Sequence, residues 1–296
     1  MTRATRETTA GQRYLALQRE AKRHGRPTDE LIQLYALECF LDRLVHSRFA
    51  ESFVLKGGVL LAALGARRPT RDIDFSMRAL SNDSAEVLRI AQEIAGALLD
   101  DGLVFDSKKA TAETIRENDD YSGVRVTLSG TLSRAVVRLH VDVNVGDPIW
   151  PEPQTIEVPR LLDGVLTVRG YPIEMVLAEK IATAIARGTA STRWRDFLDI
   201  YTLAQHHTVT SEILIQSLRR VAQHRDTALA SLNAVLADYA DIAQQRWSAW
   251  LQKQKLDSAI PKDFSVVLHA VIAFADPVIA GDVISRVWNP VSQRWE

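Results

Sequence analysis

The chain has 296 residues, a formal net charge of −1 and a single cysteine, Cys39. One cysteine excludes an internal disulfide framework and a cysteine-rich zinc site, and a nearly neutral charge argues against a protein that binds nucleic acid over its whole surface. The length suits two lobes. Because we find neither a signal-peptide pattern nor an uncharged apolar stretch of roughly 18 residues, we expect a cytoplasmic protein without a membrane segment.

Helical and extended patterns alternate through the first half of the chain. A polar arm precedes residues 28–49, where apolar residues recur at helical spacing and predict an amphipathic helix. Residues 53–58 predict a short buried strand that runs into a glycine turn at Gly57 and Gly58. The patterns that follow predict a short helix within 59–68 that Gly65 closes, a strand over 71–77 and a helix over 84–102. Residues 103–115 predict a strand that runs into a polar loop.

Two further strands are predicted over residues 121–130 and 132–146, as antiparallel partners joined near Gly130. The second strand alternates cleanly. One face carries only valine and leucine, and the other carries Arg138, His140, Asp142 and Asn144. We therefore expect one face of this strand to meet the core and the other to be polar.

The composition changes after residue 150. Proline-rich residues 146–159 predict a linker or crossover, and residues 164–171 predict a short strand. The remaining predicted elements are helices, over 172–188, 192–207, 211–224, 230–254 and 262–276. We expect a bilobed α/β protein, with an N-terminal helix and a mixed sheet in residues 1–150, then a linker and an all-helical lobe in residues 151–296.

Two aspartates stand two residues apart in the strand predicted over 71–77. Because side chains alternate along a strand, Asp72 and Asp74 share one face while Ile73 and Phe75 share the other. Adjacent carboxylates repel each other unless a cation lies between them. A bound metal ion would supply that cation; the alternative is a solvated pair on an edge strand.

Asp142 strengthens the metal interpretation, because it also projects from the polar side of an apolar strand. Three carboxylates from two strands are the arrangement that holds two Mg²⁺ ions about 3.5–4 Å apart against a triphosphate and an attacking hydroxyl. A Gly-Gly turn nearby lets backbone N–H groups approach a phosphate, although it can equally be a tight turn alone. Asp147, in a nearby loop, is a rival for the third acid.

The second half of the chain offers further charged candidates with competing explanations. Lys180 lies at the margin of the inward face of its predicted helix, where it either reaches solvent or serves an anion. Asp196 and Asp199 share a helix face one turn apart, with Arg195 four residues before Asp199, so an internal salt bridge would explain them. The arginines of residues 67–71 form a solvated loop or neutralise a polyanion.

The order and spacing of these motifs resemble the polymerase-β-like nucleotidyltransferases. Their signature is a Gly-Gly or Gly-Ser turn followed by an acid-hydrophobic-acid-hydrophobic strand, here Gly57-Gly58 and then Asp72-Ile73-Asp74-Phe75. More narrowly, KGG, RPTRDIDF, EMVLAEKIATAI and RWRDFLDIY resemble the AbiEii branch. This branch comprises nucleotidyltransferase toxins of type IV toxin–antitoxin and phage-defence systems, and it includes the MenT toxins.

The resemblance implies roles for individual residues. It gives Asp72, Asp74 and Asp142 to the metal ions, with Asp142 also placed to accept the proton of the attacking hydroxyl. It adds Lys180 and Asp196 to the catalytic residues, with Arg193 and Asp196 in the fourth motif of the family. The positions that it assigns to the nucleotide and its phosphates are Lys56, Gly57, Gly58, Thr70, Arg71, Lys180 and Arg193.

The implied function is transfer of a nucleoside monophosphate from an NTP to an RNA acceptor. The resemblance suggests the 3′ end of tRNA as that acceptor, with release of pyrophosphate, arrest of translation and growth, and a cognate antitoxin. We expect a monomer that uses Mg²⁺, with Mn²⁺ as a substitute. Two alternatives stay open: a metal-dependent glycosyltransferase that uses nucleotide sugars, and a non-catalytic partner protein with a degenerate site.

Overall fold

The computed structural model of the protein describes residues 6–78, 83–117, 121–146, 148–162, 164–255 and 260–296. Its contacts divide the chain into two compact units. Unit 1 comprises Met1–Ala63, Arg67–Asp147 and Gln154–Tyr171. Unit 2 comprises Leu64–Ala66, Pro148–Pro153 and Pro172–Glu296.

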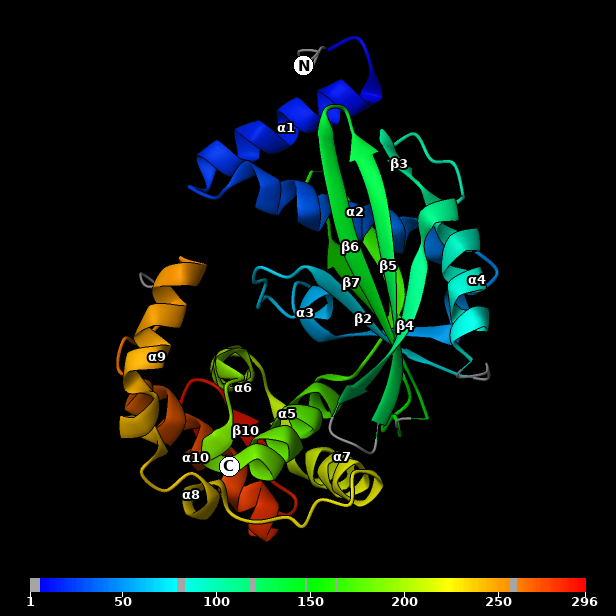
Figure 1. Ribbon diagram of the computed structural model, residues 1–296. Coiled ribbons are helices and arrows are strands. Elements are labelled where there is room, and N and C mark those ends of the chain that lie inside the picture. The colour runs from blue at the N-terminus through cyan, green and yellow to red at the C-terminus, as the bar shows by residue number, and fades with distance from the viewer. Residues whose placement is uncertain (1–5, 79–82, 118–120, 147, 163, 256–259) are drawn as a thin grey trace. The chain divides into compact units, whose positions relative to one another are not determined.

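Unit 1 is built on one large mixed sheet (Figure 1). Within the described residues the sheet has eight strands in the order β3-β5-β6-β2-β1-β8-β7, and β4 pairs with β5. Its strands are β1 Phe53–Lys56, β2 Asp72–Met77, β3 Leu103–Phe105, β4 Thr111–Glu117, β5 Tyr121–Leu132, β6 Ala135–Val145, β7 Gln154–Pro159 and β8 Val165–Gly170. Its helices are α1 Thr9–Arg23, α2 Thr28–Val45, η1 Ala50–Ser52, α3 Gly57–Leu60, α4 Ser84–Ala95 and η2 Ser107–Lys109.

The long β5–β6 hairpin confirms the predicted antiparallel pair. Its turn lies at Ser133, which has φ 53°, whereas we predicted the turn near Gly130. Gly130 instead lies inside β5, opposite Val137, where an added Cβ would approach the Val104 carbonyl to 3.1 Å. This glycine therefore serves close strand packing and not the turn.

The proline-rich stretch after residue 146 contributes a strand to the sheet. β7 pairs with β8, and β8 runs parallel to β1 with Leu55 opposite Gly170. Prolines stand at the start of the stretch and at the last position of β7, an edge strand in the order given above, where proline is tolerated. The sequence placed the domain change after residue 150, and the contacts group Gln154–Tyr171 with unit 1 because of this pairing.

Helices α2 and α4 cover one face of the sheet and form the core of unit 1 with it. On the sheet side, the core takes the alternate residues of β2 and β6 that the sequence predicted to be buried, including Ile73, Phe75, Val141 and Val143. The N-terminal residues were predicted to be a polar arm, but they form α1. Its inward positions Tyr14, Leu17 and Ala21 carried a helical period that the surrounding charges obscured.

Unit 2 is mostly helical. Its helices are α5 Ile173–Arg187, η3 Gly188–Ala190, α6 Trp194–His206, α7 Ser211–His224, α8 Leu232–Val235, α9 Tyr239–Gln254 and α10 Phe264–Ala280. Aromatic rings fill its interior: Trp194 stacks on Tyr239, and Phe264 packs edge-on against both rings. Trp247 is fully buried beside Phe264.

The prediction of an all-helical second lobe missed three short strands. β9 Val209–Thr210, β10 Val287–Asn289 and β11 Arg294–Trp295 form a small antiparallel sheet. The indole N–H of Trp288 donates to Ala204 at 2.7 Å, and that of Trp295 donates to Phe274 at 3.0 Å. Strands of two or three residues are too short to produce a recognisable alternation in the sequence.

Candidate functional site

The glycine turn of unit 1 lies directly against an acidic side chain. β1 ends at Lys56, and Gly57 follows with φ +67°, a left-handed conformation that glycine adopts at least cost. A Cβ on Gly57 would lie 1.9 Å from Asp74 Oδ2, and a Cβ on Gly58 would lie 2.9 Å from Thr70 Oγ1. A side chain at either position would displace its neighbour. Because glycine has none, the turn can lie directly against β2.

Asp72 and Asp74 share one face of β2, as the alternation predicted. Ile73 and Phe75 between and after them are fully buried on the opposite face, whereas both acids are partly exposed. Thr70 reinforces the start of the strand, because its hydroxyl donates to the backbone carbonyl of Asp72 at 3.1 Å. The two carboxylates are therefore presented together by a strand whose other side is anchored in the core.

Asp142 lies on the same face as these two acids. β2 and β6 pair in parallel with Asp74 opposite Asp142 and Asp72 opposite His140. Residues paired in register point to the same side of a sheet, and the neighbouring pair Phe75 and Val143 is buried on the other side. Three carboxylates from two adjacent strands thus share one surface.

An arginine that we did not select from the sequence holds Asp142. Arg125 lies opposite Asp142 on β5. It donates through Nε at 2.8 Å to one carboxylate oxygen and through Nη2 at 2.6 Å to the other. The hydrogen bonds from Arg125 to Asp142 raise the pKa of the guanidinium, and the charge of Asp72 adds to this effect. The sequence could have indicated Arg125, because it stands on the polar side of the strand predicted over 121–130.

This pairing affects the metal hypothesis. Within the described parts of the chain, no group of three His, Cys, Asp or Glu side chains is arranged to hold a metal ion. Both oxygens of Asp142 accept hydrogen bonds from Arg125, so its carboxylate is turned toward that residue. The donor set itself, carboxylate oxygens only, is the type that Mg²⁺ and Mn²⁺ prefer. Asp147, the rival third acid, lies outside the described residues.

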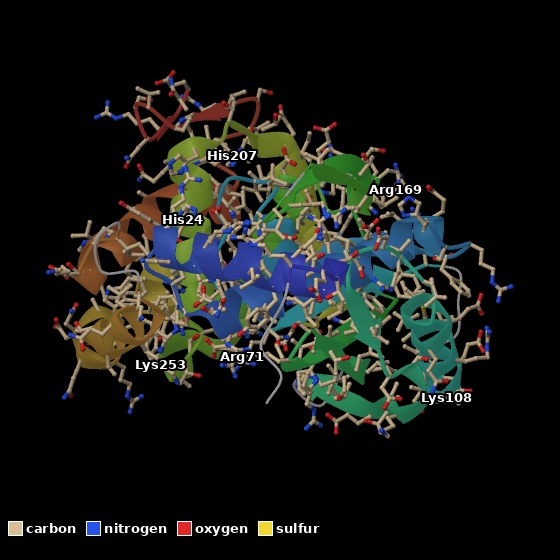
Figure 2. The ribbon with its side chains drawn as sticks, turned by 90° about the horizontal axis from the view of Figure 1, so that it is seen from above. His24, Arg71, Lys108, Arg169, His207 and Lys253 are labelled. Atoms are coloured by element: carbon tan, nitrogen blue, oxygen red, sulfur yellow. The ribbon has the colours of Figure 1, made fainter. Side chains whose placement is uncertain are left out.

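The remaining unit 1 candidates differ in exposure. Lys56 is buried, and its ammonium lies over the Tyr171 ring at 5.6 Å from the centroid. Arg67 pairs with Glu38 at 3.2 Å and also donates to the Pro159 carbonyl. Arg71 is exposed as well (Figure 2).

The charged candidates of unit 2 form a buried network between α5 and α6. Lys180 Nζ lies 2.9 Å from Asp196 Oδ1 and 2.7 Å from Asp199 Oδ2, and Arg193 Nε lies 2.9 Å from Asp196 Oδ2. Burial by itself would raise the pKa of Asp196, but Lys180 and Arg193 outweigh it and hold that pKa at about 2. The internal salt bridge weighed from the sequence exists, with Lys180 and Arg193 as partners where we had suggested the exposed Arg195.

Among the described residues, the helices are too short or too polar to span a bilayer.

Two of the solved structures to which the chain is similar come from Helicobacter pylori. A candidate nucleotidyltransferase is 16% identical with a TM-score of 0.49, covering 86% of this chain and 95% of that one. The protein JHP933 is 17% identical with a TM-score of 0.48, covering 83% and 91%. No curated protein matches the chain.

A sequence profile matches most of the chain. It describes the nucleotidyl transferase AbiEii toxin of type IV toxin–antitoxin systems, and the match spans residues 39–270. The matched range includes the glycine turn, the acids of β2 and β6 and the α5–α6 network. The chain therefore belongs to the AbiEii nucleotidyltransferase toxin family.

Proposed function

We propose that this protein transfers a nucleoside monophosphate from an NTP to the 3′ end of tRNA and thereby blocks translation and growth. Membership of the AbiEii family makes it a nucleotidyltransferase toxin and implies an NTP substrate and an antitoxin partner. The single observation that most supports the proposed chemistry is the register of β2 and β6, which puts Asp72, Asp74 and Asp142 on one face. The RNA acceptor, the monomeric state and a cytoplasmic location are part of the proposal.

The proposed reaction uses divalent metal ions, because the available donor atoms are carboxylate oxygens. Asp72 and Asp74 fit Mg²⁺ or Mn²⁺ as paired oxygen ligands, and Asp142 retains lone pairs beyond the two hydrogen bonds that it accepts from Arg125. When bound, such ions neutralise the triphosphate and stabilise charge on the entering and leaving oxygens. These three acids are the residues that would hold them.

The residues of the chain have separate tasks in the transfer. The acceptor oxygen bonds to the α-phosphorus while the bond to the pyrophosphate oxygen breaks, and Asp142 takes the proton of the acceptor hydroxyl. Gly57 and Gly58 let the turn lie against Asp74 and Thr70 and offer backbone N–H groups to the phosphates, and Thr70 fixes the backbone at Asp72. Lys56, opposite Asp74 on β1, and Arg71, next to Asp72 in the chain, add positive charge near the acids.

Lys180, Arg193 and Asp196 have a different place in the proposal. The family resemblance assigns them to the nucleotide, but each is engaged in the buried network between α5 and α6. We propose that these residues support transfer mainly by holding that network. Any direct contact with phosphate would require Lys180 to share its ammonium with two buried carboxylates.

Incubation with α-labelled NTPs and total RNA tests the reaction. We expect metal-dependent label on tRNA, and no label on RNA whose 3′-terminal diol has been oxidised with periodate. Equal labelling of oxidised RNA would contradict the 3′ end, and labelling of another RNA class would contradict tRNA. Sequencing of RNA ends after brief induction in cells would identify acceptor and nucleotide together.

Variants connect this reaction to the acids. Asp72→Asn or Asp74→Asn should lower transfer on the order of 10³-fold and abolish growth arrest, while far-UV CD stays unchanged. Glu157→Gln is the matched control, because Glu157 is an exposed acid on β7 of the same sheet. Full growth arrest by either aspartate variant would refute the assignment.

A further inference from the structure

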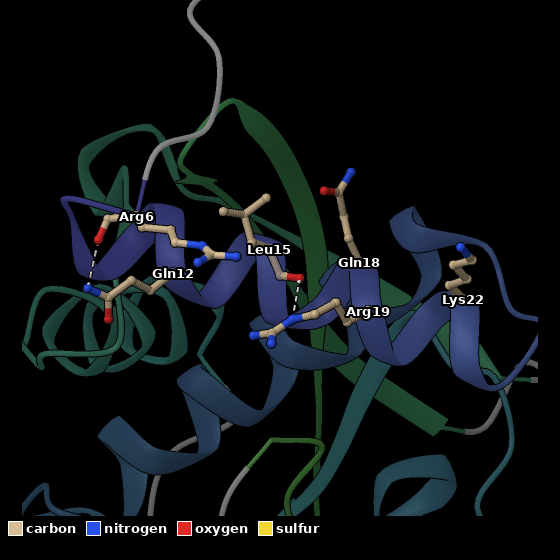
Figure 3. Close-up of a pocket in the computed structure, with 6 residues that line it drawn as sticks. All are labelled: Arg6, Gln12, Leu15, Gln18, Arg19 and Lys22. Atoms are coloured by element: carbon tan, nitrogen blue, oxygen red, sulfur yellow. Dashed lines mark hydrogen bonds between the residues drawn. The ribbon is translucent and has the colours of Figure 1, made fainter.

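A cationic hollow lies on the outward side of α1 in unit 1 (Figure 3). We call it the α1 surface and define it by its lining residues, Arg6, Gln12, Leu15, Gln18, Arg19 and Lys22. We propose that the α1 surface binds the phosphate backbone of the RNA acceptor at a distance from the reacting end. The identity of this RNA as the acceptor rests on the proposed function; the surface itself rests on the observations below.

The helix that carries this surface is firmly attached to unit 1. Tyr14, Leu17 and Ala21 on its other side are buried. The Tyr14 hydroxyl accepts a hydrogen bond from Arg134 Nε at 3.1 Å, and the same guanidinium lies over the Tyr14 ring. Thr9 at the helix start donates to Asp100 at 2.9 Å. The outward side chains therefore project from a fixed support.

The charge of the α1 surface is of one sign. Three of its residues are cations, two are primary amides and none is an acid. The acid within α1, Glu20, lies 3.8 Å from Arg23 and 3.4 Å from His24, so it is paired within its own helix. Lys22 also complements the negative end of the helix dipole, but this role does not explain Arg6 or Arg19.

The chemistry favours a phosphate backbone over a protein partner. Arginine, lysine and glutamine are among the side chains that donate to phosphate oxygens in nucleic-acid complexes. Protein interfaces depend on buried aromatic or apolar anchors, and the apolar residue lining this hollow, Leu15, is a lone half-buried leucine. Residues 12 to 22 extend about 15 Å along the helix axis, enough for an extended contact.

The part of the α1 surface beside Tyr14 is well separated from Asp142. Arg134, which contacts Tyr14, follows the turn of the β5–β6 hairpin, and Asp142 lies eight residues further along β6, about 26 Å at strand spacing. A mononucleotide or a trinucleotide cannot span this length. Only a large acceptor such as a folded tRNA can occupy both places, so the surface should affect long RNA and not short RNA.

A charge-neutralising pair of substitutions tests the proposal. We would titrate fluorescently labelled total tRNA with wild-type protein and with Arg19→Gln/Lys22→Gln, without NTP, over a range of salt concentrations. The variant should bind tRNA on the order of tenfold more weakly at low salt, with a shallower salt dependence by about one to two in the log–log slope. Binding of a trinucleotide should be unchanged.

The matched control removes two positive charges elsewhere. Lys108 and Lys253 are exposed (Figure 2), and Lys108→Gln/Lys253→Gln should bind tRNA as the wild type does. The proposal is overturned if the α1 variant keeps the wild-type affinity and slope, or if the control loses as much. It is also overturned if the α1 variant binds tRNA normally but escapes neutralisation by the antitoxin, which would make this surface a protein interface.

The outcome can be separated from that of the proposed function. Binding is measured without NTP, whereas the function is assayed as label transfer by the wild-type protein. If the wild type binds tRNA through α1 but transfers no nucleotide to it, the proposed acceptor is wrong and the surface stands. If the wild type labels tRNA and the α1 variant binds it equally well, the surface is wrong and the acceptor stands.

Discussion

The acids of β2 and β6 and the charges of α5 and α6 carry similar residue types in opposite settings. Asp72, Asp74 and Asp142 stand on the partly exposed face of a sheet, side by side on two strands. In unit 2, Asp196 and Asp199 are buried, and Lys180 lies within hydrogen-bonding distance of both. The motifs of one family thus include a group of acids on a partly exposed face and a second group whose charges already neutralise each other.

The comparison shows that a motif position does not by itself indicate a ligand contact. The carboxylates of β2 and β6 are partly exposed, so a ligand from solvent can reach them. A buried network with matched charges gains nothing from a ligand and loses much if one partner is removed. The predictions below separate these two behaviours.

The largest effect on stability should come from Lys180→Met. This substitution removes the cation that Asp196 and Asp199 share, and breaking a buried pair from one side typically costs about 3–5 kcal/mol of unfolding free energy. Urea unfolding followed by tryptophan fluorescence measures it. The double variant Lys180→Met/Asp199→Asn should recover part of the loss; an unfolding midpoint of Lys180→Met equal to that of the wild type would show that Lys180 is not a structural partner.

Two glycines with the same backbone angle isolate the contact with Asp74. Gly57 and Gly65 both have φ +67°, but a Cβ on Gly65 meets no atom within 4 Å. Either alanine substitution pays the backbone cost, about 1–2 kcal/mol. Gly57→Ala must also displace Asp74, so its transfer activity should fall on the order of 10²-fold while Gly65→Ala stays active. Equal activity of the two variants in the labelling assay would mean that the position of Asp74 is unimportant.

Lowering the pH should destabilise the α5–α6 network, because it protonates Asp196. The pKa of Asp196 is about 2 in the folded protein, below its usual value near 3.8. Its stabilising contribution, about 2 kcal/mol, is present above pH 4 and is lost as the pH falls toward 2. Unfolding free energies of the wild type and Asp196→Asn between pH 2 and 5 should therefore converge at low pH. Parallel curves would contradict the low pKa.

The smallest effect concerns Arg125, which we infer to be a positioning residue for Asp142. Arg125→Gln cannot form the bidentate pair, so transfer should slow about tenfold. Removal of its positive charge should also lower the metal concentration that gives half-maximal activity. Arg138→Gln, an exposed arginine on the same face of β6, is the control. A metal requirement unchanged by Arg125→Gln would argue that Arg125 acts elsewhere.

Much of unit 1 could be predicted because its signals are local. Alternation in β2 and β6 predicts which residues meet the core, and it placed the three acids on polar faces. Which strands become neighbours is not local information. The parallel pairing of β2 with β6 depends on long-range packing, and so does the partnership of Arg125 with Asp142.

The errors have a similar physical origin. β7 was interpreted as a linker because its prolines outweigh its short alternation, yet the edge of a sheet tolerates them. The spacing around Lys180 left its role open between solvent and an anion, because helical spacing gives only the direction of a side chain. The two aspartates that receive it come from the next helix, and nothing in the spacing specifies how closely α5 and α6 pack.

The in-register pairing of β2 and β6 limits how the length of this chain can change. Losing or gaining one residue in β6 between its turn and Asp142 would rotate that acid into the hydrophobic core, and two residues would keep the face but shift it by about 6.6 Å. Additions at the Ser133 turn leave the pairing intact. Related chains that stay active should therefore vary in the length of the hairpin tip and keep the strand below it constant.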